Sequence, residues 1–230
     1  MEVSERHEKV DFFAGEEQLQ VFHISDIHLW FSTKVLEKLE ASIIKNNPDL
    51  IVMTGDYYDL PKGAKLFRMF LQKIAKKYSI VFIMGNHDRW YGSKVSRLLS
   101  DIPNCFSVED VVYQYVSKRG FRYHITSWKN SHNLPNASDE KNIVLIHNPE
   151  KIRKEKLANI HLIFAGHLHG GQFIFYKTKS NANFPGSILY KHCSDRKRIY
   201  QTTLIVSKGL GDTFTFRFNC PKEVVCVTIV

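Results

Sequence analysis

The sequence has few cysteines, glycines and prolines, and it has no long apolar run. No stretch of the 230 residues approaches the ~20 apolar residues that a membrane-spanning helix needs. The 12 glycines and 7 prolines are too few for a collagen-like or low-complexity chain. The four cysteines (Cys105, Cys193, Cys220 and Cys226) show no CxxC spacing. They therefore indicate small core residues in a reducing compartment and not a zinc finger.

The first 17 residues are charged and contain no apolar signal core, so we expect a cytoplasmic location. The hydrophobic fraction of 43% and the aromatic fraction of 13% argue against intrinsic disorder. No linker-like composition and no internal repeat divides the chain. We therefore predict one domain that spans residues 1–230.

The chain is basic, with 32 Lys and Arg against 23 Asp and Glu, which gives a formal net charge of +9. This surplus favours an anionic partner, whether phosphate, nucleic acid or an acidic membrane face, although a solvated basic surface explains it equally well. Two groups of mainly basic residues, if paired in the fold, would form one patch for a peripheral contact with an anionic membrane surface. They are Lys65, Arg68, Gln72 and Lys76 on a predicted helix, and Lys191, Arg196, Lys197 and Arg198 near the apolar residues Phe184, Ile188, Leu189 and Tyr190.

Hydrophobic periodicity predicts an α/β chain with two sheets. The first half alternates strands and helices, which indicates a parallel sheet. Its strands are predicted at 18–25, 50–54 and 79–84, and its helices at 35–44, 64–77 and 94–99. The second half is rich in strands, predicted at 111–116, 120–126, 142–147, 160–165, 172–177, 199–207 and 223–230. A short helix is predicted at 150–157, and loops at 130–139 and 179–198.

Five short motifs with metal-binding side chains each follow a predicted strand. They are Asp26-Ile27-His28, Gly55-Asp56, Gly85-Asn86-His87-Asp88, His147 and Gly166-His167-Leu168-His169. Taken singly, each has an ordinary explanation as a turn or a hydrogen-bonded core histidine. In open α/β sheets, however, ligands bind at the carboxyl ends of the strands. The five motifs together therefore predict one metal site.

The ligand types indicate which ions would bind. Imidazole, carboxylate and amide groups without thiolate suit Mn²⁺, Fe, Zn²⁺ or Mg²⁺. The candidate ligands are too many for one ion, but they fit two divalent ions that share Asp56. Such a pair clamps the attacking and leaving oxygens of a phosphoryl displacement and lowers the pKa of a bound water. The candidates are Asp26, His28, Asp56, Asn86, His147, His167 and His169.

From Asp26 to Gln172 this motif set resembles the calcineurin-like metallophosphoesterase superfamily. Gly170-Gly171-Gln172 and Ser207-Lys208-Gly209-Leu210-Gly211 are similar to the bacterial phosphodiesterase branch of YkuE and YaeI. A group near that branch hydrolyses the pyrophosphate of UDP-2,3-diacylglucosamine in lipid A synthesis. The resemblance implies a two-sheet β-sandwich flanked by helices, in four layers α/β/β/α.

The resemblance also implies a role for each motif residue. Asp26, His28 and His169 would hold the first metal, and Asn86, His147 and His167 the second, with Asp56 bridging them. His87 would protonate or stabilise the leaving oxygen, and Asp88 would orient it.

Neighbouring residues give weaker indications. Asp59 either orients a ligand or serves as a turn residue, and Gln172 either supports the last histidine loop or begins a strand. Trp30 and Trp90 follow metal motifs and would grip a nucleobase or an acyl chain, unless they simply pack their loops. Arg89 is placed to meet a substrate phosphate.

We therefore expect a metal-dependent hydrolase of phosphodiester or pyrophosphate bonds, with Mn²⁺ favoured. The expected partner is a phosphorylated small molecule or a lipid-linked nucleotide, and the favoured specific substrate is UDP-2,3-diacylglucosamine at a membrane. One alternative is a soluble nuclease or nucleotide phosphodiesterase, since the +9 charge would steer polyanions. A binding scaffold without catalysis is another. The sequence does not decide whether the substrate is a phosphomonoester or a phosphodiester, and it does not decide the oligomeric state.

Overall fold

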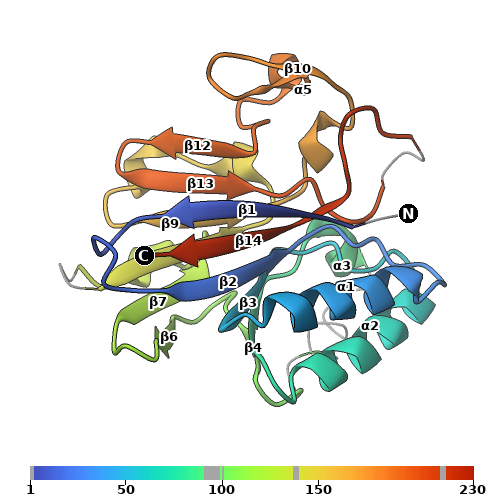
Figure 1. Ribbon diagram of the computed structural model, residues 1–230, viewed down its shortest axis with the longest axis horizontal. Coiled ribbons are helices and arrows are strands. Elements are labelled where there is room, and N and C mark those ends of the chain that lie inside the picture. Colours follow the sequence, from blue (N-terminus) through green and yellow to red (C-terminus); the bar gives the residue numbers. More distant parts are fainter. Residues whose placement is uncertain (1–2, 91–98, 100, 137–139, 213–215) are drawn as a thin grey trace.

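Two six-stranded sheets stack face to face in the computed structural model (Figure 1), which describes residues 3–90, 99, 101–136, 140–212 and 216–230. In the first sheet the strand order is β1-β14-β2-β3-β4-β5, and β2 to β5 run parallel. These strands are β1 (Ser4–Val10), β14 (Glu223–Ile229), β2 (Leu19–Ile24), β3 (Leu50–Met53), β4 (Ser79–Phe82) and β5 (Cys105–Ser107). The four parallel strands therefore end at one edge of the sheet.

The second sheet has the order β12-β13-β9-β8-β7-β6, with β13, β9, β8 and β7 parallel to one another. Its strands are β12 (Arg196–Ile199), β13 (Thr202–Val206), β9 (Leu162–Ala165), β8 (Lys141–Ile146), β7 (Arg122–Ser127) and β6 (Tyr113–Val116). The parallel strands of this sheet also end together. The loops at that edge contact the loops at the matching edge of the first sheet, as where the amide of His167 donates to the carboxylate of Asp26.

The strands are apolar along their whole length because both of their faces are covered. In β3, Leu50 and Val52 point into the core between the sheets, whereas Ile51 and Met53 point to the helices. Those helices are α1 (Lys34–Asn46) and α2 (Pro61–Ile74), which lie on the outer face of the first sheet (Figure 1). Continuous apolar runs are the pattern of parallel strands that are buried on both faces.

The predicted fold class, two β-sheets flanked by helices, is confirmed, with a difference in the outer layer of the second sheet. The expected helix at 150–157 is instead two 3₁₀ turns, η2 (Pro149–Lys151) and η3 (Lys154–Lys156). The turns separate because Ile152 takes extended backbone and buries its side chain against the second sheet.

Other predicted boundaries also differ from the structure. Helix α2 begins at Pro61, three residues before its predicted start, because the fixed φ of proline suits the first helical position. The predicted strand 199–207 is one arm of a hairpin, β12–β13, that turns at 200–201, so β12 takes up the end of the expected 179–198 loop. The elements β1, β5, α3 (Asn86–Trp90) and η1 (Ser131–Asn133) were not predicted. The helix expected at 94–99 lies outside the described residues except for Leu99.

A small unit projects beyond the two sheets, at the top of Figure 1. Strands β10 (Ile174–Lys177) and β11 (Asn183–Pro185) pair with each other and not with either sheet, and α5 (Gly186–Leu189) follows directly. Among the described residues, no helix combines the length and the apolar character that crossing a bilayer would require.

Candidate metal centre

The loops that follow β2, β3, β8 and β9 bind to one another through their backbones. The amide of Asp26 donates to the carbonyl of Gly55 over 2.9 Å, and the amide of His28 donates to the carbonyl of Asp56 over 3.0 Å. Across the two sheets, the amide of His167 donates to the carboxylate of Asp26 over 2.9 Å. The carboxyl ends of both sheets therefore meet, and they carry all five motifs to one place.

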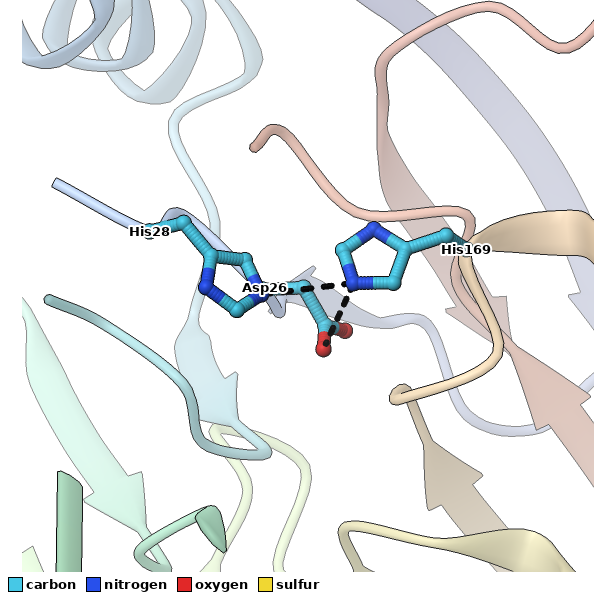
Figure 2. Close-up of side chains that lie close together, drawn as sticks. All are labelled: Asp26, His28 and His169. Carbon is cyan, nitrogen blue, oxygen red and sulfur yellow. Dashed lines mark hydrogen bonds and ion pairs between the residues drawn. The ribbon is translucent and has the colours of Figure 1, made fainter. Parts of the chain in front are cut away.

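A first cluster consists of Asp26, His28 and His169, all of them buried (Figure 2). The two imidazole Nε2 atoms of His28 and His169 are 3.3 Å apart. The Nε2 of His169 is also 3.8 Å from Asp26 Oδ1. In Figure 2 the Nε2 of His169 faces both the Nε2 of His28 and the carboxylate of Asp26, and the three donor atoms lie within 4.8 Å of one another.

A second cluster consists of Asp56, His147 and His167, with Asn86 beside it. The Nε2 of His147 lies 3.2 Å from Asp56 Oδ2 and 2.9 Å from Asn86 Oδ1. The Nδ1 of His167 is 3.1 Å from the same Nε2. Asp56 Oδ2 is also 3.8 Å from His28 Nε2, which places this carboxylate between the two clusters.

The electrostatics of the clusters suit cations. Burial alone would raise the pKa of Asp26, but His169 and its neighbours lower that pKa to about 2, so the carboxylate stays ionised. Burial lowers the pKa of His169 to about 4, which keeps this imidazole neutral and able to donate a lone pair. Burial would also lower the pKa of His147, but Asp56 and Asp26 raise it to about 9, so the site favours positive charge there. These buried oxygen and imidazole donors fit divalent ions of several kinds.

Asp59 contacts three side chains at the centre. Its Oδ1 accepts from the Nδ1 of His28 over 2.8 Å and from the Nδ1 of His87 over 2.7 Å. Its Oδ2 accepts from the indole Nε1 of Trp30 over 2.6 Å. One carboxylate thus contacts a candidate ligand, the candidate acid His87 and an aromatic side chain. Of the two roles that the sequence allowed for Asp59, these contacts favour the orienting residue over the turn residue.

The predicted role of Asp88 in orienting His87 is wrong. The buried Asp88 carboxylate accepts from three backbone amides, those of Asp56, Tyr57 and Gly85, over 2.7 to 2.8 Å. It therefore ties the loop after β4 to the loop after β3, while Asp59 holds the imidazole of His87.

Five of the seven candidate ligands have left-handed backbone. The φ angles are 50° at Asp26, 47° at His28, 56° at Asp56, 70° at His167 and 46° at His169. For a residue with a side chain this conformation costs roughly 1–2 kcal/mol. Glycine could relieve that strain but would supply no ligand, so the observed residues combine strained backbone with donor atoms.

The glycines in the motifs are required by close contacts. A Cβ atom on Gly85 would lie 2.1 Å from Asp56 Oδ1, and one on Gly166 would lie 1.9 Å from Ser25 Oγ. Neither distance allows a methyl group, so these glycines let the loops approach the acidic ligands closely.

The residues predicted to contact substrate lie around this centre. Trp90 is exposed and tilts over His87, with 4.0 Å between the ring centroids. Arg89 pairs with Glu109 at 2.6 Å. Gln172 donates its backbone amide to the carbonyl of His169 and precedes β10, which begins at Ile174, so of the two alternatives it belongs to the last histidine loop.

Two hollows adjoin the clusters, and they have no lining residue in common. A groove of about 660 Å³ begins at His28 and has mainly apolar walls, which include Leu29, Trp30, Phe31, Val35 and Leu210. A more polar pocket of about 400 Å³ begins at Asn86, His147 and His167 and reaches Arg89, Lys129 and Lys151.

One neighbour of the centre was not predicted. The guanidinium of Arg217 lies 3.2 Å from the Nδ1 of His169 and also donates to the carbonyl of Lys208 over 2.9 Å. No motif surrounds Arg217 in the sequence, so only the folded chain reveals this contact.

The two predicted basic clusters do not form one patch. Helix α2 lies at the bottom of Figure 1 and β12 near the top, on different sheets. Arg68 on α2 pairs with Asp101, which neutralises part of that face.

A family model and several curated relatives match most of this chain. Residues 19–171, which hold all five motifs, match the family model described as calcineurin-like phosphoesterase. The chain is 28% identical to the uncharacterized metallophosphoesterase YkuE of Bacillus subtilis (strain 168), over 94% of this chain and 80% of that protein. It is 23% identical to the phosphodiesterase YaeI of Escherichia coli (strain K12), over 98% of this chain and 87% of that protein.

Solved structures share the fold. TT1561 of Thermus thermophilus has a TM-score of 0.53 at 12% identity, covering 85% of this chain and 90% of that one. A dimetal phosphatase from Danio rerio has a TM-score of 0.52 at 12% identity, covering 83% of this chain and 87% of that one. The family match extends over well over half of the chain and includes every candidate ligand. The chain therefore belongs to the calcineurin-like phosphoesterase family of metal-dependent phosphoester hydrolases.

Proposed function

We propose that this protein hydrolyses a phosphodiester or pyrophosphate bond with two divalent metal ions, Mn²⁺ being the favoured ion. The observation that carries the proposal is the position of Asp56, whose Oδ2 is 3.2 Å from His147 and 3.8 Å from His28. Asp26, His28 and His169 would hold one ion, and Asn86, His147 and His167 the other, with Asp56 shared. Bound ions would supply Lewis acid stabilisation of the phosphoryl oxygens and a water of lowered pKa.

His87 would act on the leaving oxygen. Its Nδ1 faces the Asp59 carboxylate, so the proton available for the leaving group is carried by Nε2. The Asp59 carboxylate fixes the tautomer and the plane of the ring, as a carboxylate does for a catalytic histidine. The tilted indole of Trp90 covers the ring and limits its rotation.

The two hollows favour a substrate with two arms. One hollow begins at the first cluster and the other at the second, so a phosphorus atom held between the clusters has room for a substituent on each side. A monoester would occupy only one of them. The groove suits apolar chains, and the pocket, in which Arg89, Lys129 and Lys151 outnumber Glu109, suits an anionic or nucleotide group. UDP-2,3-diacylglucosamine has both kinds of arm, and it is the specific substrate that we propose.

The class of reaction is tested with bis-p-nitrophenyl phosphate and p-nitrophenyl phosphate in the presence of Mn²⁺, Fe²⁺, Zn²⁺ or Mg²⁺. We expect turnover of the diester in preference to the monoester. Folded protein without turnover under every ion would refute the assignment and favour a binding scaffold. Asp56→Ala should abolish turnover and reduce the bound metal, whereas Asp101→Ala, at an exposed carboxylate, should change neither.

The substrate is tested by comparing detergent-solubilised UDP-2,3-diacylglucosamine with nucleotide diesters and DNA. Phe31→Ala, in the apolar groove, should raise KM for the lipid nucleotide and leave bis-p-nitrophenyl phosphate unaffected. Preferred cleavage of DNA with a steep dependence on salt would contradict the lipid substrate and support a nuclease.

A further inference from the structure

Residues 173–190, which contain β10, β11 and α5, expose many apolar side chains together with residues 216–218; we name these two segments the apolar lobe. Of the 17 large apolar side chains exposed among the described residues, eight lie on it. Ile188 and Leu189 at the end of α5 are 70% and 79% exposed, and Phe175 and Phe216 are 60% and 63% exposed. Grouped exposure of this kind marks a contact surface, because scattered apolar residues would need no explanation.

Aromatic pairs join the parts of the apolar lobe. Phe173 and Phe216 have ring centroids 5.9 Å apart, and Phe175 and Phe218 have centroids 5.7 Å apart. The amide of Ile174 donates to the carbonyl of Phe218 over 2.9 Å. The segment 216–218 therefore forms one surface with β10, although some 40 residues of sequence separate them.

The charge around the apolar lobe is mainly of one sign. Residues 157–194 contain no Asp or Glu, and Lys177, Lys179 and Lys191 are exposed within that segment. Two acids contact the segment from outside it: Asp195 pairs with Lys177 at 2.5 Å, and Glu150 accepts from the backbone amide of Lys191 over 3.0 Å. A second copy of this surface would bring lysines against lysines, so self-association is disfavoured. A lipid bilayer with acidic headgroups offers both matching features, because its interior is apolar and its surface is anionic.

The apolar lobe is fixed directly to the metal centre. The 3₁₀ turn η4 (His169–Gly171) contains a candidate ligand and leads into β10. Gly171 packs on Gly186 of α5 so closely that a Cβ atom on Gly171 would lie 3.0 Å from its Cα. A partner that binds the apolar lobe would therefore lie next to the two clusters of candidate ligands.

We propose that the apolar lobe binds the surface of an anionic lipid bilayer, with Ile188, Leu189, Phe175 and Phe216 entering the headgroup boundary and the lysines contacting acidic lipids. This goes beyond the proposed hydrolysis and does not depend on it. Binding in this way would present the centre to phosphodiesters of the lipid layer itself.

The test is co-sedimentation of the full chain with vesicles of phosphatidylcholine, alone or mixed with phosphatidylglycerol. We expect binding to the mixed vesicles that weakens as salt is added. The double variant Ile188→Ser, Leu189→Ser should bind them about tenfold or more weakly. The matched control is Ile44→Ser, Met69→Ser, on α1 and α2, where the exposures are 56% and 58%; it should bind like the parent.

Folding and catalysis are measured separately from binding. Without vesicles, both double variants should keep the parent's thermal unfolding and its turnover of bis-p-nitrophenyl phosphate. No binding to mixed vesicles by the parent, or equal loss in both variants, would overturn the proposal. A parent that dimerises through this surface and ignores vesicles would also overturn it. A parent that binds vesicles but hydrolyses nothing would contradict only the proposed function.

Discussion

Replacing Asp59 by alanine is expected to reduce turnover of a diester by about 10³-fold or more, even when metal is saturating. The Asp59 carboxylate holds the Nδ1 atoms of His28 and His87 at 2.8 and 2.7 Å. Alanine removes both contacts in one step. His28 then loses the partner that directs its Nε2 toward the first cluster, and His87 loses the group that sets its tautomer and the plane of its ring.

The magnitude follows from these two contacts. Loss of a hydrogen-bond partner behind a metal-binding histidine typically costs about 10–100-fold in metal affinity or activity. Loss of a positioned general acid typically costs about 10²–10⁴-fold. Saturating metal restores most of the first loss but not the second. Asp59→Asn keeps an acceptor oxygen without its charge, so its turnover should lie between those of the parent and Asp59→Ala.

The assay measures kcat and KM for bis-p-nitrophenyl phosphate across a metal titration, for Asp59→Ala, His87→Ala and the double variant. Because Asp59 is proposed to act through His87, the double variant should be little slower than His87→Ala. Asp101→Ala, at an exposed carboxylate, is the matched control. Full turnover of Asp59→Ala at high metal, or fully multiplicative losses in the double variant, would refute the reasoning.

Three further predictions concern the rest of the molecule. Gly85→Ala would put a Cβ atom 2.1 Å from Asp56 Oδ1, so we expect loss of bound metal and of about 1–3 kcal/mol of stability, measured by metal analysis and urea unfolding. Burial would raise the pKa of Asp195, but Lys208 and Lys177 lower it to about 2, below its ordinary 3.8. This depressed pKa contributes about 2 kcal/mol of stability above pH 4 that is lost as the pH falls toward 2. The difference in unfolding free energy between the parent and Asp195→Asn should therefore narrow over that range, and a constant difference would contradict the assignment. A chelator should lower both turnover and the melting temperature, because buried carboxylates such as Asp26 would lose their cations, and Mn²⁺ should restore both; an unchanged melting temperature would argue against metal in the clusters.

The sequence predicted much of the fold because the strands behind the motifs are short, continuous apolar runs. Such runs arise where a parallel strand is covered on both faces, as β3 and β9 are. Strand β1 was missed because its sequence, SERHEKV, is mostly polar and it lies at the edge of the first sheet. The position of β10 outside both six-stranded sheets could not be predicted either, since its apolar pattern is also that of a strand in a main sheet.

The candidate centre could be predicted as a set of residues but not as a set of contacts. Motif spacing indicates which side chains reach one edge of the sheets, yet it does not show where each carboxylate points. Asp88 follows His87 directly and nevertheless turns to backbone amides, while Asp59, 28 residues away, holds the imidazole. Because Asp88 is next to His87 in the sequence, it was predicted to orient the imidazole. The two residues lie in α3, where neighbouring side chains point in different directions, so the contact does not form.

The left-handed backbone at five candidate ligands makes the stability of the centre depend on its cations. Glycine at positions such as 28 or 169 would relax the backbone by roughly 1 kcal/mol, but it would also remove a buried imidazole and the stability that a bound cation supplies. Without metal, the strain at these positions lowers the stability of the fold, and with metal bound the cation offsets it.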